Sequence, residues 1–432
     1  MLPRPDLLDG DSPSTLEVYQ LTNEPDVPSS HIYMEAQIFS PDSRRLVLHR
    51  SATPHGSDKD DPEHSYLLCD LENDGELAPI TSELGATGPS ISPDGGWLYY
   101  FVNETEIDGG RLSLRRVRLD GTERETVAVV DGPLPGTDRR PSRIYPLSTI
   151  SSDGQRIAIS CFLGKGTPET VDWGLMVFHI ATGEVSLILR GPSWCNIHPQ
   201  YCRSTDPEAS HDILVQENHG NVTDASGAIS RGISPPGADI HVIRDDGSNF
   251  RDMPWGRDGV EGCQGHQCWR GRSLWAITST GKNVTTAEGG EDHIQELIEG
   301  LPAPHAGHVG LNTPGGVRHD LSHSFDGTPR FCHFATDAQA HRFITDYRGE
   351  ASWSLYAARF ADAGDESASG ESALRDWRYL LDTRSGMKTN KSHIHPFLSP
   401  DGRLGFFNSD ESGTLQAYMA RGLDQLWSAA AR

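Results

Sequence analysis

The chain has 432 residues, of which 35% are hydrophobic, and its 45 glycines and 28 prolines favour many short strands and turns over long helices. Its formal net charge of -24 disfavours nucleic acid and anionic membranes as partners. The first residues hold no apolar core long enough for a signal peptide, and no run of about 18 apolar residues occurs in the sequence. The seven cysteines lack the spacing of a disulfide framework. We therefore expect a cytoplasmic protein.

A turn signal of the form Ser-x-Asp-Gly, or a close relative of it, recurs along the chain, and each copy is followed by an apolar strand. In most units a third strand, a polar turn and a fourth strand come next. Four short antiparallel strands repeated radially are the blades of a β-propeller. The seven copies of the signal begin, in chain order, at Ser40, Ser92, Ser152, Tyr201, Trp269, Phe325 and Ser399.

The two ends of the chain complement each other. The last unit has no fourth strand after Tyr418–Arg421, and the strand-like residues 17–22 belong to no unit of their own. Pairing the two would close the ring and protect its sheet edges. We therefore expect an all-β, seven-bladed propeller over residues 1–432, closed by the N-terminal strand. Residues 1–14 would be an N-terminal extension, and residues 281–317 and 362–373 would be loop insertions.

Histidine is concentrated just before the turns. Segments that enter the innermost strands of a propeller meet at one mouth of its axis, so these histidines should converge. His393 and His395 lie two apart in an expected strand, which would place both rings on one face. Neutral imidazoles that meet on an axis suit a transition metal. The full set is His31 with Tyr33, His198 with Tyr201 and Arg203, His266, His319 with His323, and His393 with His395.

Other signals are weaker. His219 ends the second strand of the fourth unit, where a base could reach a substrate, but a lone histidine at a strand end is more often exposed or structural. Cys263 and Cys268 flank His266 without a second pair at finger spacing, which disfavours structural zinc. Nucleophile-elbow, phosphate-loop and dinucleotide motifs are absent from the sequence, which argues against a hydrolase domain and nucleotide binding.

Two stretches match a known family in both residue type and order. They are residues 245–249 followed by 261–269, which read Asp-Asp-Gly-Ser-Asn and Glu-Gly-Cys-Gln-Gly-His-Gln-Cys-Trp, and residues 393–396, His-Ile-His-Pro. With weaker matches at residues 18–22, 198–201 and 217–220, the pattern resembles the oligogalacturonate lyases nearly end to end. Those enzymes are seven-bladed propellers of cytoplasmic pectin breakdown.

The resemblance implies a metal site. In that family three histidines and a glutamine hold manganese, and the matching positions are His266, His393, His395 and Asn390. Asparagine in place of glutamine is shorter by one methylene, so calcium and zinc stay open beside manganese. The family's catalytic base falls on His219, within a motif that differs from the family's.

The resemblance also implies β-elimination. A bound divalent cation would neutralise the carboxylate beside C5, the base would remove the C5 proton, and loss of the C4 oxygen would leave a 4,5-unsaturated uronate. Arg203 is a candidate catalytic clamp on a second carboxylate, chosen for its bidentate geometry. The expected substrate contacts are Tyr33, His198, Tyr201 and His319.

Three functions remain open at this stage. The first is a metal-dependent lyase acting on short oligogalacturonate, with an acidic oligosaccharide as its partner. The second keeps the elimination but acts on another uronate-capped oligosaccharide, such as rhamnose-glucuronate. The third is a non-catalytic propeller that binds proteins, which shares the turns but gives no reason for histidines at the mouth.

Overall fold

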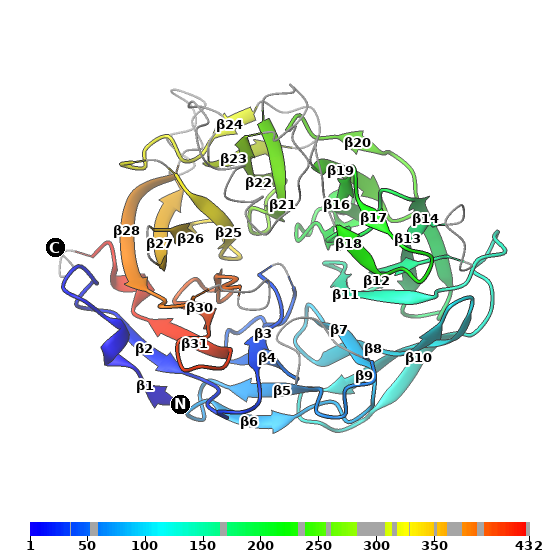
Figure 1. Cartoon of the computed structure of the whole chain (residues 1–432), viewed down its shortest axis with the longest axis horizontal. Coiled ribbons are helices and arrows are strands. Elements are labelled where there is room, and N and C mark those ends of the chain that lie inside the picture. The colour runs from blue at the N-terminus through cyan, green and yellow to red at the C-terminus, as the bar shows by residue number, and fades with distance from the viewer. Residues whose placement is uncertain are drawn as a thin grey trace.

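The computed structural model describes residues 1–34, 36–51, 59–164, 171–231, 238–255, 261–282, 307–312, 318–327, 329–349, 352–360, 374–386 and 393–428. Within these residues, six antiparallel sheets and a two-stranded ribbon stand around a common axis, and helix is confined to short 3-10 turns at Pro5–Leu7, Ala209–His211 and Leu423–Gln425 (Figure 1). The predicted all-β propeller is therefore confirmed. No helix among the described residues is long and apolar enough to cross a membrane.

The first three sheets follow one another in chain order, each with its first strand nearest the axis (Figure 1). The first contains β3 (Ser29–His31), β4 (Arg45–Arg50), β5 (Ser65–Asp70) and β6 (Glu76–Pro79). The second contains β7 (Ala86–Ile91), β8 (Trp97–Glu106), β9 (Gly109–Arg118) and β10 (Glu125–Val130). The third contains β11 (Arg143–Ile150), β12 (Arg156–Phe162), β13 (Trp173–His179) and β14 (Val185–Gly191).

The fourth sheet is eight-stranded, and one residue pair, Ala238 with Cys263, joins its two halves. The first half contains β15 (Gln200–Tyr201), β16 (Asp212–Asn218), β19 (Ala238–Arg244) and β20 (Arg251–Asp252). The second half contains β21 (Glu261–Trp269), β22 (Trp275–Lys282), β23 (Gly307–Asn312) and β24 (Arg318–Asp320). The ribbon contains β17 (Val222–Thr223) and β18 (Ile229–Arg231).

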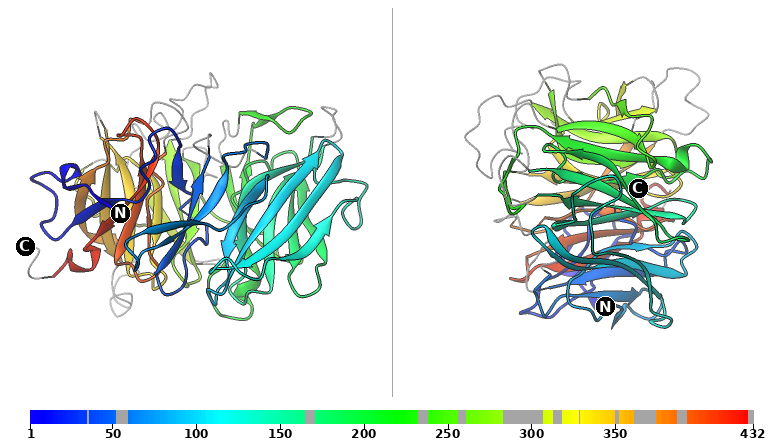
Figure 2. Two further views of the ribbon diagram at one scale, coloured as in Figure 1. Left: turned by 90° about the horizontal axis from the view of Figure 1, so that it is seen from below. Right: turned by 90° about the vertical axis from the view of Figure 1, so that its right-hand side faces the viewer.

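The last two sheets complete the arrangement. One contains β25 (Phe331–Thr336), β26 (Arg342–Arg348), β27 (Trp353–Phe360) and β28 (Leu374–Asp382). The other contains β29 (Phe397–Leu398), β30 (Leu404–Ser409), β31 (Gln416–Arg421), β2 (Glu17–Gln20) and β1 (Leu2–Pro3). In it β2 pairs antiparallel with β31, in register from Glu17 with Arg421 to Gln20 with Tyr418. The strands run between the two faces of the disc (Figure 2).

The Ser-Pro-Asp-Gly turns connect first and second strands by a repeated set of hydrogen bonds. In the second sheet the Ser92 hydroxyl donates to Asp94 at 2.5 Å and accepts from the backbone N–H of Trp97 at 3.0 Å. Gly95 adopts φ +71°, which favours glycine. The same bonds recur at Ser399, whose hydroxyl donates to Asp401 at 2.6 Å. The sequence motif therefore fixes where the innermost strand of a blade ends.

Apolar cores lie between neighbouring sheets. Phe101 of β8 and Phe178 of β13 are fully buried, with ring centroids 5.1 Å apart, and bind the second sheet to the third. Burying such a side chain stabilises the fold by roughly 1.5–3 kcal/mol.

Two expectations about the chain's organisation need correction. The sixth repeat was expected to turn at residues 325–327, with its second strand at 330–334, but Phe331–Thr336 is the innermost strand of that sheet. Residues 307–312 form β23 inside the range 281–317 that was expected to be an insertion. The range 362–373 lies outside the described residues.

Candidate functional site

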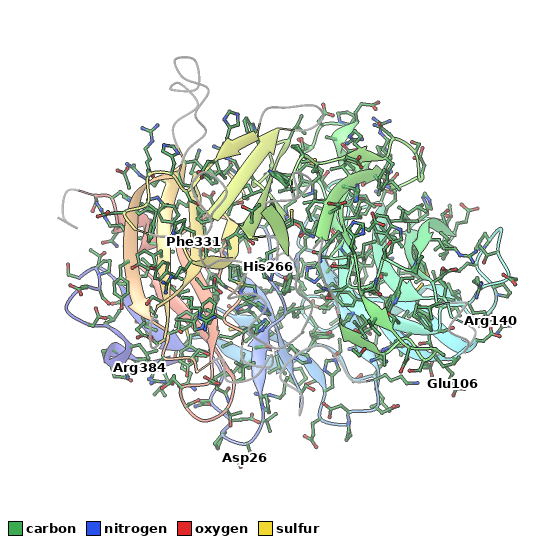
Figure 3. The ribbon with its side chains drawn as sticks, turned by 45° about the horizontal axis from the view of Figure 1, so that its top comes forward. Asp26, Glu106, Arg140, His266, Phe331 and Arg384 are labelled. Atoms are coloured by element: carbon green, nitrogen blue, oxygen red, sulfur yellow. The ribbon has the colours of Figure 1, made fainter. Side chains whose placement is uncertain are left out.

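A cavity of about 280 Å³ opens on the propeller axis. Most of its lining comes from the segments by which the chain enters the innermost strands. These segments lie at the opposite end of the strands from the Ser-Pro-Asp-Gly turns. Figure 3 shows His266 near the middle of the ring. The ring-bearing side chains of the lining are His49, His198, His266, His333, His393, His395, Tyr33, Tyr66 and Tyr145.

Four histidines of this lining contact one another and form what we call the axial cluster: His266, His333, His393 and His395. The ring centroid of His333 lies 4.3 Å from that of His266, 5.2 Å from that of His393 and 4.7 Å from that of His395. One nitrogen from each of His333, His393 and His395 lies within 4.8 Å of the others, as do ligand atoms of His266, Cys332 and His333. This nitrogen-rich donor set suits a transition metal.

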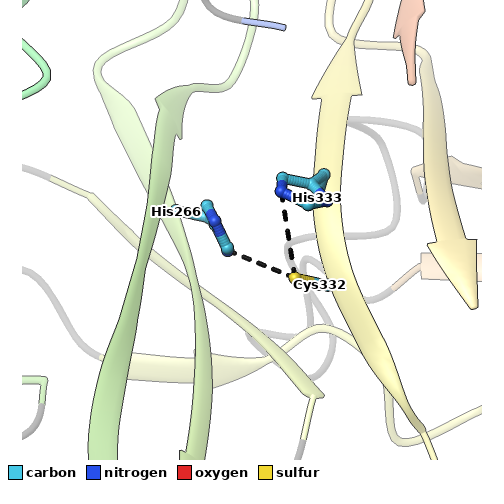
Figure 4. Close-up of side chains that lie close together, drawn as sticks. All are labelled: His266, Cys332 and His333. Carbon is cyan, nitrogen blue, oxygen red and sulfur yellow. Dashed lines mark hydrogen bonds between the residues drawn. The ribbon is translucent and has the colours of Figure 1, made fainter. Parts of the chain in front are cut away.

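Irregular pairing of the innermost strands aims these side chains at the axis. The register of β21 with β22 shifts between Cys263 and Gln267, around His266. The register of β25 with β26 shifts between Phe331 and Phe334, so the adjacent Cys332 and His333 both reach toward His266 (Figure 4). Bulges of this kind commonly re-aim side chains next to active sites.

His393 and His395 converge without the strand that was expected to hold them. The strand β29 begins only at Phe397, and His395 has φ +43°, a conformation that costs energy for a residue with a Cβ. Their ring centroids are nevertheless 5.2 Å apart. The predicted convergence is present, but a strained turn produces it instead of strand alternation.

A second group on the cavity wall centres on His198. Its Nε2 lies 2.8 Å from the Tyr145 hydroxyl and 3.0 Å from Asn196 Oδ1, and its Nδ1 lies 3.4 Å from the Tyr33 hydroxyl. The amide oxygen of Asn196 only accepts, and the Tyr145 hydroxyl donates to it, so we assign the proton of His198 to Nε2 and the lone pair to Nδ1. Burial lowers the pKa of His198 to about 3, so the ring is neutral near pH 7.

Tyr33 connects the two groups. Its ring centroid is 5.0 Å from that of His198 and 4.7 Å from that of His395. The structure thus brings five of the predicted site residues to the cavity. They are Tyr33, His198, His266, His393 and His395.

His219 lies in a different environment, which we call the strand-end cluster: Glu217, His219, Asp239, His241 and Asp252. His219 Nε2 contacts Asp239 at 2.9 Å, and His241 contacts Asp252 at 2.9 Å and Glu217 at 3.3 Å. The hydrogen bond from His241 lowers the pKa of Glu217 to about 2. Each histidine contacts a carboxylate, and ligand atoms of Glu217, His219 and Asp239 also lie within 4.8 Å of one another, but His219 is not among the residues that line the cavity.

Three further predicted residues lie away from the cavity lining. Tyr201 is buried in the core between sheets, with its hydroxyl 3.2 Å from Asp245. Arg203 follows β15 and precedes Ser204. The carbonyl of Ser204 accepts a hydrogen bond from the hydroxyl of Ser152, which belongs to one of the repeated turns. Arg203 therefore lies toward the face of the ring that carries the turns, opposite the cavity. His319 lies on β24, the outermost strand of its half-sheet, beside Trp275. Asn390 lies outside the described residues.

His49, Tyr66, Tyr145 and His333 are aromatic residues of the lining that the sequence did not single out. The sequence places His333 in a second strand because Phe325-Asp326-Gly327 resembles the repeated turn. The actual turn is at Asp337, whose Oδ1 accepts from the backbone of His341 at 2.7 Å and of Arg342 at 3.1 Å. Asp337 stands where the other turns have serine, and Gln339 stands where they have aspartate, so this turn does not carry the repeated signal.

No protein-family model matches the chain. The chain is 23% identical to an oligogalacturonate lyase of Dickeya dadantii over 447 aligned positions, which cover 96% of each chain. It also superposes on the solved structure of an oligogalacturonate lyase in complex with manganese, with a TM-score of 0.65, 18% identity and 96% of each chain covered. An oligogalacturonate lyase of Vibrio parahaemolyticus gives a TM-score of 0.63, with 16% identity and 95% of each chain covered. These matches confirm that the resemblance extends over the whole chain.

Proposed function

We propose that this chain, which resembles the oligogalacturonate lyases over nearly its whole length, is a metal-dependent lyase that cleaves uronate oligosaccharides by β-elimination. The observation that carries the proposal is the axial cluster, in which imidazoles from β21, from β25 and from the segment before β29 meet in one cavity. Oligogalacturonate is the first candidate substrate, because it is the substrate named for the relative in Dickeya dadantii. A binding module would gain nothing from this cluster.

The metal would be held by His266, His393 and His395, with Asn390 as a further proposed ligand. Imidazole donors fit manganese or zinc better than calcium, which takes oxygen ligands. Manganese is the first choice, since it is bound in the related structure. When bound, a divalent cation supplies positive charge to the carboxylate beside C5 and so lowers the pKa of the C5 proton.

Proton removal requires a base inside the cavity. His198 meets this need better than His219, because it lines the cavity and its Nδ1 carries the lone pair. A neutral imidazole can accept a proton, and a uronate carboxylate entering the cavity would raise the depressed pKa of His198 toward the working range. Tyr33 would orient the sugar between His198 and the metal. Under this proposal His219 keeps a role only if the substrate extends to the end of β16.

The charge distribution limits the partners. A chain with a net charge of -24 repels an acidic oligosaccharide at long range, so binding must come from local groups at the axis. The same charge opposes nucleic acid and anionic membranes as partners. A cytoplasmic location is part of the proposal, and the cysteines of the chain are buried.

We also propose that the ring has seven blades. The two halves of the eight-stranded sheet each have the strand number of a blade, and a single residue pair connects them. The pairing of β2 with β31 would then close the ring by completing the last blade with an N-terminal strand.

The test is ultraviolet absorbance of the C4=C5 double bond conjugated to the carboxylate. Oligomers of galacturonate, glucuronate and iduronate are offered to chelator-treated protein with manganese, with calcium and without metal. The proposal expects product with galacturonate oligomers and manganese, and little without metal. If product forms only with glucuronate or iduronate oligomers, that uronate replaces galacturonate as the proposed substrate. If no uronate gives product, a non-catalytic binding module becomes the better explanation.

A further inference from the structure

We propose that His333 is an additional ligand of the metal through its Nε2 atom, and that Asp346 holds the ring in position for it. The inference rests on the proposed metal site of the lyase. It adds to that site a residue which the repeat pattern had placed on the wrong strand.

His333 occupies the middle of the axial cluster. It is shared by both groups of potential ligands, with His266 on one side and His393 and His395 on the other. Around an ion with metal–nitrogen bonds of about 2.1 Å, neighbouring nitrogens lie roughly 3 Å apart and opposite ones about 4.2 Å. In each group the potential ligand atoms lie within 4.8 Å of one another, which is slightly more than the separation of ligand nitrogens around an ion. Small side-chain movements would therefore bring His333 into the coordination sphere.

Asp346 fixes the ring of His333. The carboxylate lies 2.6 Å from Nδ1 and accepts the backbone N–H groups of His333 at 2.8 Å and of Cys332 at 3.2 Å. Both side chains are buried, with 1% and 0% exposure. Because Nδ1–H is committed to Asp346, the lone pair of the ring is on Nε2. Metal-binding histidines commonly donate their other N–H to a carboxylate in this way, which orients the ring and raises its basicity.

The neighbouring Cys332 is a weaker candidate for the same place. Its sulfur lies 3.6 Å from His266 Nδ1 and 4.0 Å from His333 Nε2 (Figure 4). Manganese prefers nitrogen and oxygen donors to sulfur. The donor geometry therefore favours the imidazole.

The strand-end cluster offers a matched control. His241 is also a buried histidine, with 4% exposure, and its Nδ1 also lies against a carboxylate, Asp252, at 2.9 Å, although Asp252 is 62% exposed. It is not among the residues that line the cavity. The variants His333→Gln and Asp346→Asn can thus be compared with His241→Gln and Asp252→Asn, which remove the same chemical groups elsewhere.

The experiment is calorimetric titration of chelator-treated full-length protein with Mn²⁺, together with pulsed electron paramagnetic resonance of the loaded protein. We expect His333→Gln to weaken Mn²⁺ binding by about 100-fold and to reduce the nitrogen hyperfine signal. Asp346→Asn should weaken binding by roughly 10-fold. The two control variants should bind as the wild type does. Circular dichroism of the metal-free variants checks their folding.

The outcomes separate the two proposals. If the wild type binds no Mn²⁺ at one site per chain, the proposed metal dependence fails. If the wild type binds and His333→Gln binds equally well with the same nitrogen signal, only the role of His333 is overturned. Should His333→Gln not fold, Asp346→Asn decides the matter, and unchanged affinity in that variant overturns the inference.

Discussion

The axial cluster and the strand-end cluster are both rich in histidine, yet they are built for different tasks. In the axial cluster four imidazoles from β21, from β25 and from the segment before β29 face one cavity, with His333 at the centre, and Asp346 contacts His333 from behind. In the strand-end cluster three carboxylates surround two histidines, and neither histidine lines the cavity. A nitrogen-rich set of donors in one cavity suits a transition metal.

Removing an axial ligand should give the largest effect. We expect His393→Gln to abolish stoichiometric Mn²⁺ binding and to lower kcat by at least about 10³-fold, which corresponds to roughly 4 kcal/mol of transition-state stabilisation. His241→Gln, the matched change in the strand-end cluster, should alter kcat by less than about threefold. Metal analysis of the purified proteins and ultraviolet rate assays measure both. Equal losses in the two variants would erase the distinction between the clusters.

The second comparison concerns the base. We expect His198→Gln to lower kcat by about 10²–10⁴-fold with Mn²⁺ affinity retained, because a general base contributes that much. His219→Gln should have a far smaller effect, since His219 is not among the residues that line the cavity. Steady-state kinetics with saturating metal compare the two. The reverse order would return the base to the end of β16 and require the substrate to reach that far.

Much of the fold was predictable from the sequence because the turns carry their own signal. Ser92 and Asp94 make the same bonds as Ser399 and Asp401, and each such set marks the end of an innermost strand. The prediction failed where the turn lost its motif. At the sixth innermost strand Asp337 takes the place of the repeated serine and accepts the backbone N–H of Arg342, while Gln339 replaces the repeated aspartate and Ala340, at φ +61°, replaces the glycine. His319 was then assigned to the mouth and His333 was not.

Site residues could be predicted only where their position in the sequence, relative to a motif or a turn, was enough to place them at the cavity. His266, His393 and His395 followed from the resemblance and from their position before the turns. His333 required knowledge of a shift in strand register, which no local pattern encodes, because it depends on the pairing of β25 with β26. His219 illustrates a further limit. Side chains alternate along a strand, so the face that His219 presents depends on the register of β16 with β19.

Acid should destabilise the axial region through His198. The pKa of this residue falls from an ordinary value of 6.5 to about 3 on folding, so the unfolded chain binds a proton that the folded chain does not. The contribution of His198 to stability is therefore complete above about pH 6.5 and is lost as the pH falls toward 3. At about pH 5.5 the loss is roughly 1.4 kcal/mol. Urea unfolding of metal-free wild type and His198→Gln at several pH values should show this difference, and parallel pH dependences would contradict it.

The smallest expected effect belongs to the strand-end cluster. His219 and Asp239 are 31% and 19% exposed, so solvent screens their ion pair. A double-mutant cycle of His219→Gln and Asp239→Asn should give a coupling energy below about 1 kcal/mol, the range of partly exposed pairs. Adding Mn²⁺ should leave that coupling unchanged. A coupling that grew with Mn²⁺ would mean that the ion enters this cluster as well, and the separation between a metal-binding axis and a carboxylate-rich strand end would no longer hold.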